Sequence, residues 1–274
     1  LCKGKILGIV PKSHIPNHHE NYEQRWFTQP TFDYPQTITI EKEEIPFSTE
    51  LVFQNEDSPL FSFGVEICED LLVPVSPSCK MTANGALMIF NLSASNITAT
   101  KPAYRYNLIQ MQSAKLNCGY IYSNASTAES TTDTVFDGGC LIFENGECLA
   151  ESKLLTMGQT VTAYAEIDLE KLQAERLQNN NIQTAEDADD FKISFRLESN
   201  NFSAERIFPR HPFIPTEKNK LSQRCEEILS IQSIALARRL ETLRYPKVVI
   251  GLSGGLDSTL ALLVVAKAFD MLGI

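Results

Sequence analysis

The sequence predicts an α/β protein made of two parts in succession. Short β-type runs bounded by turn residues fill the chain up to about residue 170. A segment with apolar residues at helical spacing separates two of these runs, which is typical of strands and helices arranged in layers. Further on, a buried-type strand, a Gly-rich loop and an apolar helix follow one another over residues 247–272. This succession is how a doubly wound, Rossmann-like α/β domain begins.

The composition is that of a globular protein, and it argues against a nucleic-acid partner. Of the 274 residues, 43% are hydrophobic and 21% are charged, and the net charge is -10. Since affinity for a phosphate backbone comes from Lys and Arg, this balance argues against general nucleic-acid binding. The seven cysteines form no CxxC pair, which favours reduced thiols in a cytoplasmic protein. No run approaches the ~20 apolar residues of a membrane span, and there is no signal peptide.

The expected elements of the first part come in order along the chain. Strand-like runs occupy residues 6–10, 61–67, 85–92 and 119–123, and a helical pattern covers residues 104–117. Residues 139–150 form a β-hairpin, because Asn145-Gly146 supplies a turn with positive φ. A further strand is expected over residues 160–167, and Asp168 caps a charged helix over residues 169–177.

The periodicity weakens after this helix and then resumes. Residues 178–220 contain an Asn run, an acidic run and three prolines, which predicts an irregular connector. An amphipathic helix over 222–243, a strand over 247–252 and a helix over 260–272 follow. The sequence therefore predicts a first domain at residues 1–177, a connector at 178–220 and the start of a second domain at 221–274.

Both ends of the sequence have the character of cut ends. The chain begins with Leu1-Cys2-Lys3-Gly4, without an initial Met, and it stops inside or just past a helix. We therefore expect it to be a piece of a longer protein, with the second domain truncated.

The loop Ser253-Gly254-Gly255-Leu256-Asp257-Ser258-Thr259, preceded by Gly251-Leu252, has the chemistry of a phosphate-binding loop. Its glycines let backbone N–H groups approach an anion, and the following helix directs its positive end to the same place. The spacing and the Lys of a Walker A loop are absent. The loop resembles the SGGxDS loop of the pyrophosphatase-type ATP enzymes, which form an adenylated intermediate. The resemblance implies that residues 251–259 bind ATP, with Asp257 as the candidate Mg²⁺ ligand.

Two strand ends carry the candidates for covalent catalysis. Cys68 follows the run 61–67, and Lys12 lies just after the run 6–10. A lysine near a thiolate stabilises it, and also stabilises the oxyanion that forms on attack at an amide. Taken alone, however, Cys68 is more often an inert core residue and Lys12 a surface residue.

The surrounding residues change this balance. Pro11-Lys12-Ser13-His14 resembles the lysine motif of nitrilase-family amidases, and Gly64-Val65-Glu66-Ile67-Cys68-Glu69-Asp70 resembles their nucleophile motif. The likeness covers roughly residues 1–175 and implies a nitrilase-like α-β-β-α sandwich. It implies that Cys68 attacks the amide carbon, Lys12 stabilises the tetrahedral intermediate, and Glu20 is the second, supporting glutamate. The general-base glutamate of that family precedes the lysine motif, where this sequence does not extend.

A nitrilase-type domain followed by an SGGLDST loop resembles the family of glutamine-dependent NAD(+) synthetases. In that family one domain hydrolyses glutamine, and the ammonia reaches a second domain, where ATP adenylates deamido-NAD(+) and ammonia displaces AMP. The resemblance implies glutamine, ATP with Mg²⁺ and deamido-NAD(+) as substrates, no prosthetic group, and a cytoplasmic homo-oligomer without a membrane partner. By position in the motifs, the residues implied to contact glutamine are Ser95, Lys101, Glu69 and His18, the last standing where the family often has a Tyr.

Two other functions remain open from the sequence. The chain could be a stand-alone carbon–nitrogen hydrolase, although a hydrolase that uses water needs no ATP loop, or a non-catalytic scaffold fragment. Without the upstream glutamate and most of the ATP domain, the 274 residues by themselves are expected to be inactive.

Overall fold

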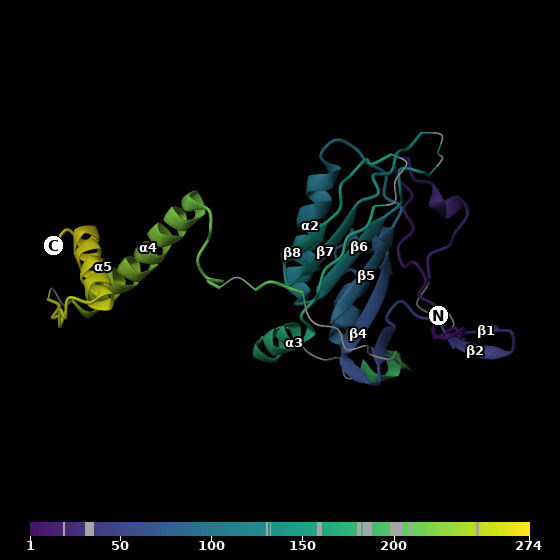
Figure 1. Ribbon diagram of the computed structural model, residues 1–274, viewed down its shortest axis with the longest axis horizontal. Coiled ribbons are helices and arrows are strands. Elements are labelled where there is room, and N and C mark those ends of the chain that lie inside the picture. Colours follow the sequence, from purple (N-terminus) through teal and green to yellow (C-terminus); the bar gives the residue numbers. More distant parts are fainter. Residues whose placement is uncertain are drawn as a thin grey trace. The chain divides into compact units, whose positions relative to one another are not determined.

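Two units, Leu1–Arg206 and Ile207–Ile274, make up the chain in the computed structural model (Figure 1). The structure describes residues 1–18, 20–30, 36–129, 131, 133–157, 161–179, 182, 188–197, 205–208, 210–244 and 247–274. The first unit is built on a mixed sheet with helices beside it, and the second contains two long helices. The predicted α/β class is confirmed. Within the described residues, no helix combines the length and the apolar character that a membrane span requires.

A seven-stranded sheet forms the centre of the first unit, in the order β8-β7-β6-β5-β4-β3-β9. The three central strands β4, β5 and β6 run parallel, and the antiparallel strands β3 and β7 flank them. Parallel strands end at the same edge of a sheet, so the residues that follow β4, β5 and β6 lie close together. The strand bounds are β3 Val52–Asn55, β4 Ser58–Ile67, β5 Met88–Ser93, β6 Gly119–Asn124, β7 Cys140–Glu144, β8 Glu147–Glu151 and β9 Lys192–Phe195.

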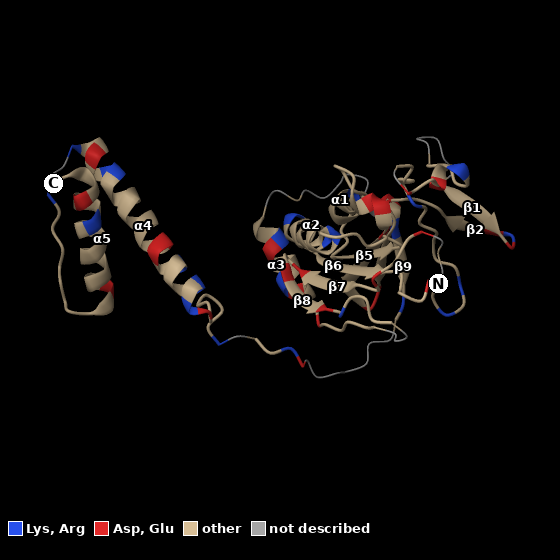
Figure 2. Cartoon of the chain, turned by 90° about the horizontal axis from the view of Figure 1, so that it is seen from above, with Lys and Arg blue, Asp and Glu red and all other residues tan. Residues whose placement is uncertain are grey.

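Helices α1 (Pro77–Ala83) and α2 (Lys101–Leu116) lie on one side of this sheet (Figure 2). Their apolar side chains, among them Met81 and Ile109, belong to one buried core that also contains Phe143. Full burial of each such side chain stabilises the fold by about 1.5–3 kcal/mol. The helix predicted over residues 104–117 is thus confirmed, and it begins at Lys101.

A third helix, α3 (Leu169–Gln178), begins at the predicted cap. The Asp168 carboxylate accepts a hydrogen bond from the Lys171 amide at 2.9 Å, which satisfies one of the N–H groups left over in the first turn. The hairpin of β7 and β8 is also confirmed, with φ of 46° at Asn145 and 81° at Gly146. Both predictions depend on residues that act on their immediate neighbours in the chain: a capping residue in one case and a pair of turn residues in the other.

A second hairpin escaped prediction. Strands β1 (Thr37–Ile40) and β2 (Glu43–Pro46) pair antiparallel in a small separate sheet. Glu41 and Lys42 form the turn with φ of 51° and 75°. Because no Asn or Gly stands at these positive-φ positions, the sequence gives no turn signal there.

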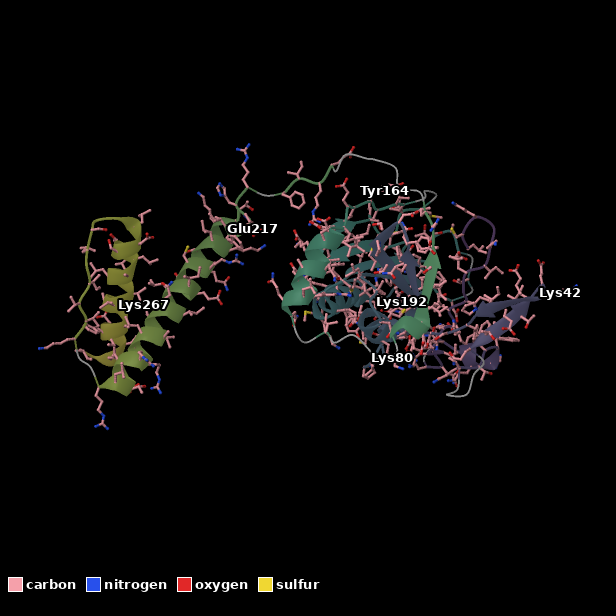
Figure 3. All side chains as sticks on the ribbon, turned by 90° about the horizontal axis from the view of Figure 1, so that it is seen from below. Lys42, Lys80, Tyr164, Lys192, Glu217 and Lys267 are labelled. Carbon is pink, nitrogen blue, oxygen red and sulfur yellow. The ribbon has the colours of Figure 1, made fainter. Side chains whose placement is uncertain are left out.

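Three predicted strand features are corrected in the first unit. Residues 6–10 form no strand and make one bridge, between Ile9 and Phe47. Residues 161–167 are also non-strand, and Tyr164 is 83% exposed (Figure 3), because a β-type run becomes a strand only beside a hydrogen-bonding partner. The connector expected to be irregular contains η3 (Ala188–Phe191) and β9, which pairs parallel with β3.

The aromatic residues explain why β9 joins the sheet. Phe195 of β9 packs edge-on against Phe61 and Phe63 of β4, with ring centroids 5.9 Å apart in both pairs. Phe63 also stacks on Phe53 of β3 at 5.3 Å. Side-chain packing can therefore keep a strand of four residues in the sheet, although its sequence pattern is too short to predict a strand.

The second unit consists of α4 (Lys218–Leu243) and α5 (Leu256–Leu272), which pack on each other. Lys267 of α5, marked in Figure 3, donates a hydrogen bond to the Ser230 hydroxyl of α4 at 3.1 Å. The strand predicted over residues 247–252 is wrong, because the described residues of this unit offer no neighbouring strand for it to pair with. A Rossmann-like domain here, and the domain boundaries given above, stay predictions.

Candidate active site

The candidate nucleophile lies at the carboxyl edge of the parallel strands. Cys68 follows the last residue of β4 and begins a short 3-10 helix, η2 (Cys68–Leu71). In the strand register Ile67 pairs with Leu92, and Ser93 pairs with Asn124. The ends of three neighbouring strands therefore surround the thiol.

The Cys68 backbone has a conformation that residues other than Gly rarely adopt. Its φ angle is 52°, in the left-handed region. A non-glycine residue in this region is strained, and such strain is concentrated at functional sites. The turn presents the thiol of Cys68 at the rim of the sheet.

A cavity of about 360 Å³ joins Cys68 to Lys12. Lys12 belongs to the segment before the 3-10 helix η1 (Glu23–Arg25), 56 positions ahead of Cys68 in the sequence (68 − 12). The structure therefore brings together Lys12 and Cys68, two of the three residues that the motifs assigned to catalysis. The other lining residues are Glu23, Ile67, Leu92, Ser93, Ala94, Ser123, Asn124 and Ala125.

Glu23 is a cavity residue that the sequence analysis missed. Its carboxylate forms an ion pair with the Lys12 ammonium, at 2.6 Å between Oε2 and Nζ. The Lys12 side chain is 17% exposed, so this pair is partly shielded from solvent. No local sequence pattern predicts the ion pair, because it depends on how the chain between Lys12 and Glu23 folds back.

Glu20, the expected supporting glutamate, is hydrogen-bonded to the side chain of Asn96. Its carboxylate accepts a hydrogen bond from the Asn96 amide at 2.5 Å, and Lys101 donates to the other side of Asn96 at 2.7 Å. The side chain of Asn96 thus links two predicted site residues, Glu20 and Lys101. Their roles toward a substrate stay predictions, since neither lines the cavity.

Of the remaining predicted glutamine contacts, Ser95 is bonded to a residue of the cavity wall. The Ser95 backbone is fixed by Asn124, which accepts from its N–H and donates to its C=O, both at 2.8 Å. Asn124 itself lines the cavity. Glu69 follows Cys68 in η2 and His18 is exposed, and neither contributes to the cavity wall.

A buried polar network supports the cavity from inside the sheet. Glu66 is fully buried, accepts from the Ser78 amide at 2.9 Å and accepts from the Tyr120 hydroxyl. Asn91 donates to Tyr120 at 3.1 Å and accepts from Ser93 at 2.7 Å. Burial raises the pKa of Glu66 above its usual value, and that of Tyr120 well above its own. The sequence carries a signal for this network, because the polar residues Glu66 and Asn91 interrupt the apolar runs 61–67 and 85–92.

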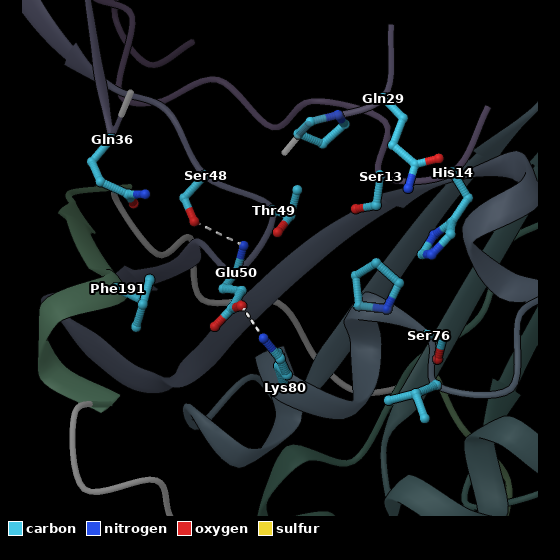
Figure 4. Close-up of a pocket in the computed structure, with 13 residues that line it drawn as sticks. Ser13, His14, Gln29, Gln36, Ser48, Thr49, Glu50, Ser76, Lys80 and Phe191 are labelled. Carbon is cyan, nitrogen blue, oxygen red and sulfur yellow. Dashed lines mark hydrogen bonds and ion pairs between the residues drawn. The ribbon is translucent and has the colours of Figure 1, made fainter. Parts of the chain in front are cut away.

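A second cavity, of about 690 Å³, is lined in part by the two residues that follow Lys12 (Figure 4). His14 and Ser13 line it, and Lys80 and Glu50 form an ion pair at 2.5 Å on its wall. Neither Lys12 nor Cys68 reaches this wall. Of these two cavities, the one of about 360 Å³ is therefore the one that both Lys12 and Cys68 line.

The Gly-rich loop of the second unit precedes a helix, as predicted. Gly254 has φ of 82°, and α5 begins at Leu256. The Thr259 hydroxyl donates to the Gly255 carbonyl at 2.9 Å, and the Ser253 and Ser258 hydroxyls lie 3.2 Å apart. The loop is exposed, and Asp257 stands in the first turn of α5, near the positive end of its dipole.

Comparisons with known proteins agree with the motifs. The family model described as carbon-nitrogen hydrolase matches residues 2–176. The glutamine-dependent NAD(+) synthetase of Mycobacterium tuberculosis is 40% identical over 281 aligned positions, which cover 100% of this chain and 41% of the relative. The synthetase of the same name from Mycobacterium leprae is also 40% identical, with the same coverage.

A solved structure is similar as well. The crystal structure of a glutamine-dependent NAD(+) synthetase from Cytophaga hutchinsonii matches 57% of this chain and 24% of that protein, at 26% identity and a TM-score of 0.47. The chain thus spans about two fifths of the length of the curated relatives named above, 41% in each case.

Proposed function

Because this chain belongs to the carbon-nitrogen hydrolase family, we propose that it carries the glutamine-hydrolysing site of a glutamine-dependent NAD(+) synthetase. The observation that supports this most directly is the cavity shared by Lys12 and Cys68. A thiol and an ammonium on one wall are the groups needed to attack an amide and to stabilise the oxyanion.

In the proposed reaction the Cys68 thiolate attacks the side-chain carboxamide carbon of glutamine. Lys12 stabilises the negative oxygen of the tetrahedral intermediate. When the intermediate collapses, its C–N bond breaks, the nitrogen takes up the proton that the thiol lost and leaves as ammonia, and a thioester remains on Cys68. Water then hydrolyses the thioester to release glutamate and restore the thiol. Glu23 holds the Lys12 ammonium at the cavity wall through their ion pair.

The second unit suits the ATP-dependent half of such an enzyme. We propose that residues 251–259 bind the phosphates of ATP, with Asp257 and phosphate oxygens as ligands of Mg²⁺. ATP would adenylate the carboxylate of deamido-NAD(+) with release of pyrophosphate, and ammonia would displace AMP. On this proposal residues 1–177 form the glutaminase domain, 178–220 the connector and 221–274 the beginning of the ATP-binding domain.

The test separates the two nitrogen sources in the full-length protein. Cys68→Ala should abolish glutamate release and glutamine-dependent NAD formation, and leave NAD formation from added ammonium unchanged, because the thiol acts only on glutamine. Chromatographic assay of glutamate and NAD measures both. Cys225→Ala, which removes an exposed thiol on α4, should change neither rate.

Two results would contradict the proposal. Glutamine hydrolysis at the normal rate by Cys68→Ala would show that the nucleophile lies elsewhere. Amide hydrolysis that proceeds in the native protein with no ATP-dependent NAD formation from either nitrogen source would favour a stand-alone hydrolase.

A further inference from the structure

Asp70 is a buried carboxylate two residues after the candidate nucleophile. Its side chain is 1% exposed and accepts four hydrogen bonds. The donors are the amides of Ser13 at 3.3 Å, His14 at 2.8 Å and Ile67 at 3.0 Å, and the His14 ring nitrogen Nδ1 at 3.1 Å. A carboxylate has about four lone-pair sites, so this one is fully used.

These donors come from the two segments that carry the catalytic pair. Ser13 and His14 follow Lys12 directly, and Ile67 precedes Cys68 directly. One carboxylate therefore holds the backbone of both segments, although they are far apart in the sequence. Three of the four donors are backbone amides, so the carboxylate fixes the position of the chain itself.

The bond from Ile67 also bears on the conformation of Cys68. It closes the turn across Cys68, whose φ of 52° is disfavoured for any residue except Gly. The same carboxylate thus holds the thiol in its strained turn and fixes the start of the segment that follows Lys12.

We propose that Asp70 is a positioning residue that holds the Lys12 ammonium beside the Cys68 thiol. The inference rests on the proposed function only in taking Lys12 and Cys68 as the reacting pair. Its test measures the charge around the thiol and not the hydrolysis of glutamine, so either idea can fail without the other.

The experiment compares a neutral and an anionic alkylating reagent on the same thiol. Iodoacetamide and iodoacetate are reacted with the whole 274-residue chain at pH 8.5 and low salt, and the Cys68 peptide is followed by mass spectrometry. A nearby ammonium accelerates the anionic reagent relative to the neutral one, so the ratio of the two rates reports the presence of Lys12 at the thiol.

Asp70→Asn should lower this ratio by about threefold, the effect expected of one partly exposed charge. The amide keeps the size of the side chain but turns an NH₂ donor toward amides that are donors themselves. Lys12→Met should lower the ratio as much, and the double variant no further, because both changes remove the same interaction.

The sign of the change distinguishes positioning from the direct effect of charge. Loss of the negative charge of Asp70 would by itself favour iodoacetate and raise the ratio. A fall in the ratio therefore reports a displaced Lys12, and an unchanged or raised ratio in folded Asp70→Asn would overturn the proposal. Glu144→Gln is the matched control: it alters a fully buried carboxylate with several donors away from this cavity, and it should leave the ratio unchanged.

A second variant keeps the proposal testable if Asp70→Asn does not fold. His14→Ala removes the one side-chain donor to Asp70 and leaves the carboxylate in place. The ratio should fall in the same direction by a smaller factor, because Asp70 loses one of its four donors. No change in the ratio of this variant would count against the proposal.

Discussion

Cys68 illustrates how much one backbone angle decides. Its φ of 52° strains any side chain there, so the choice of substitution matters for stability as well as for chemistry. We predict that Cys68→Gly is more stable than Cys68→Ala by about 0.5–1 kcal/mol, because Gly adopts the left-handed region without steric cost. Urea denaturation of the two variants, followed by far-UV circular dichroism, measures the difference.

Leu72, just beyond η2, provides the control for this comparison. Its φ is −84°, in the right-handed region, and its side chain is 42% exposed. There the order should reverse, with Gly less stable than Ala by about 0.5–1 kcal/mol. Greater stability of Ala at position 68 would show that the Cys68 turn relaxes when the thiol is removed.

At the scale of an element, the β7–β8 hairpin depends on its turn glycine for two reasons. Gly146 has φ of 81°, and a Cβ at this position would lie 2.8 Å from the Ala114 Cβ of α2. We predict that Gly146→Ala lowers the free energy of unfolding by about 1–3 kcal/mol, through backbone strain and through overpacking against the helix. Thermal and urea unfolding of the chain check this value.

Gly4 separates the two contributions. It has the same φ of 81°, but no atom lies within 4 Å of a Cβ built on it. Gly4→Ala should therefore lose only the backbone part, about 1 kcal/mol. Equal losses at the two positions would mean that the close approach of the hairpin to α2 adds no energy.

The elements also show where prediction from sequence succeeds. The hairpin at Asn145-Gly146 and the helix capped by Asp168 are correct, because a turn residue and a capping residue act on their immediate neighbours. Strand β9 was missed and the strand at residues 247–252 was wrong for one common reason. Strand formation depends on the neighbouring strand, and neither the presence nor the absence of that neighbour is visible locally.

At the scale of the first unit, Glu144 joins segments that are distant in the sequence. Its buried carboxylate accepts from Arg206 at 2.6 and 2.9 Å, from Lys171 at 3.0 Å and from the Asp168 amide at 2.7 Å. Burial acts to raise the pKa of Glu144, but these donors outweigh it and hold the pKa below its usual 4.5. The carboxylate therefore fastens α3 and the last residue of this unit to β7.

This depressed pKa has a consequence for stability against acid. A carboxyl group whose pKa is lower in the folded state contributes stability that is present above the unfolded value and is lost as the pH falls below it. We predict that the free energy of unfolding decreases between pH 5 and pH 3 and that Glu144→Gln reduces this decrease. Urea unfolding at several pH values measures both slopes.

Glu56→Gln is the comparison for the acid prediction. Glu56 pairs with Arg196 at 2.5 Å, but both side chains are exposed, so solvent weakens the pair. Glu56→Gln should leave the decrease in the free energy of unfolding between pH 5 and pH 3 unchanged. If Glu56→Gln and Glu144→Gln flatten the slope equally, burial at Glu144 is not what couples stability to pH.

The sequence by itself determined the features that neighbouring residues impose. These include the turn glycines, the helix cap, the Gly-rich loop ahead of α5, and Lys12 and Cys68 as motif residues. Only the tertiary structure decided that Lys12 and Cys68 face one cavity, that Glu23 pairs with Lys12, and that Asp70 joins both segments. The physical reason is distance along the chain: such contacts form when strand order and register are set, and these depend on the packing of the whole sheet.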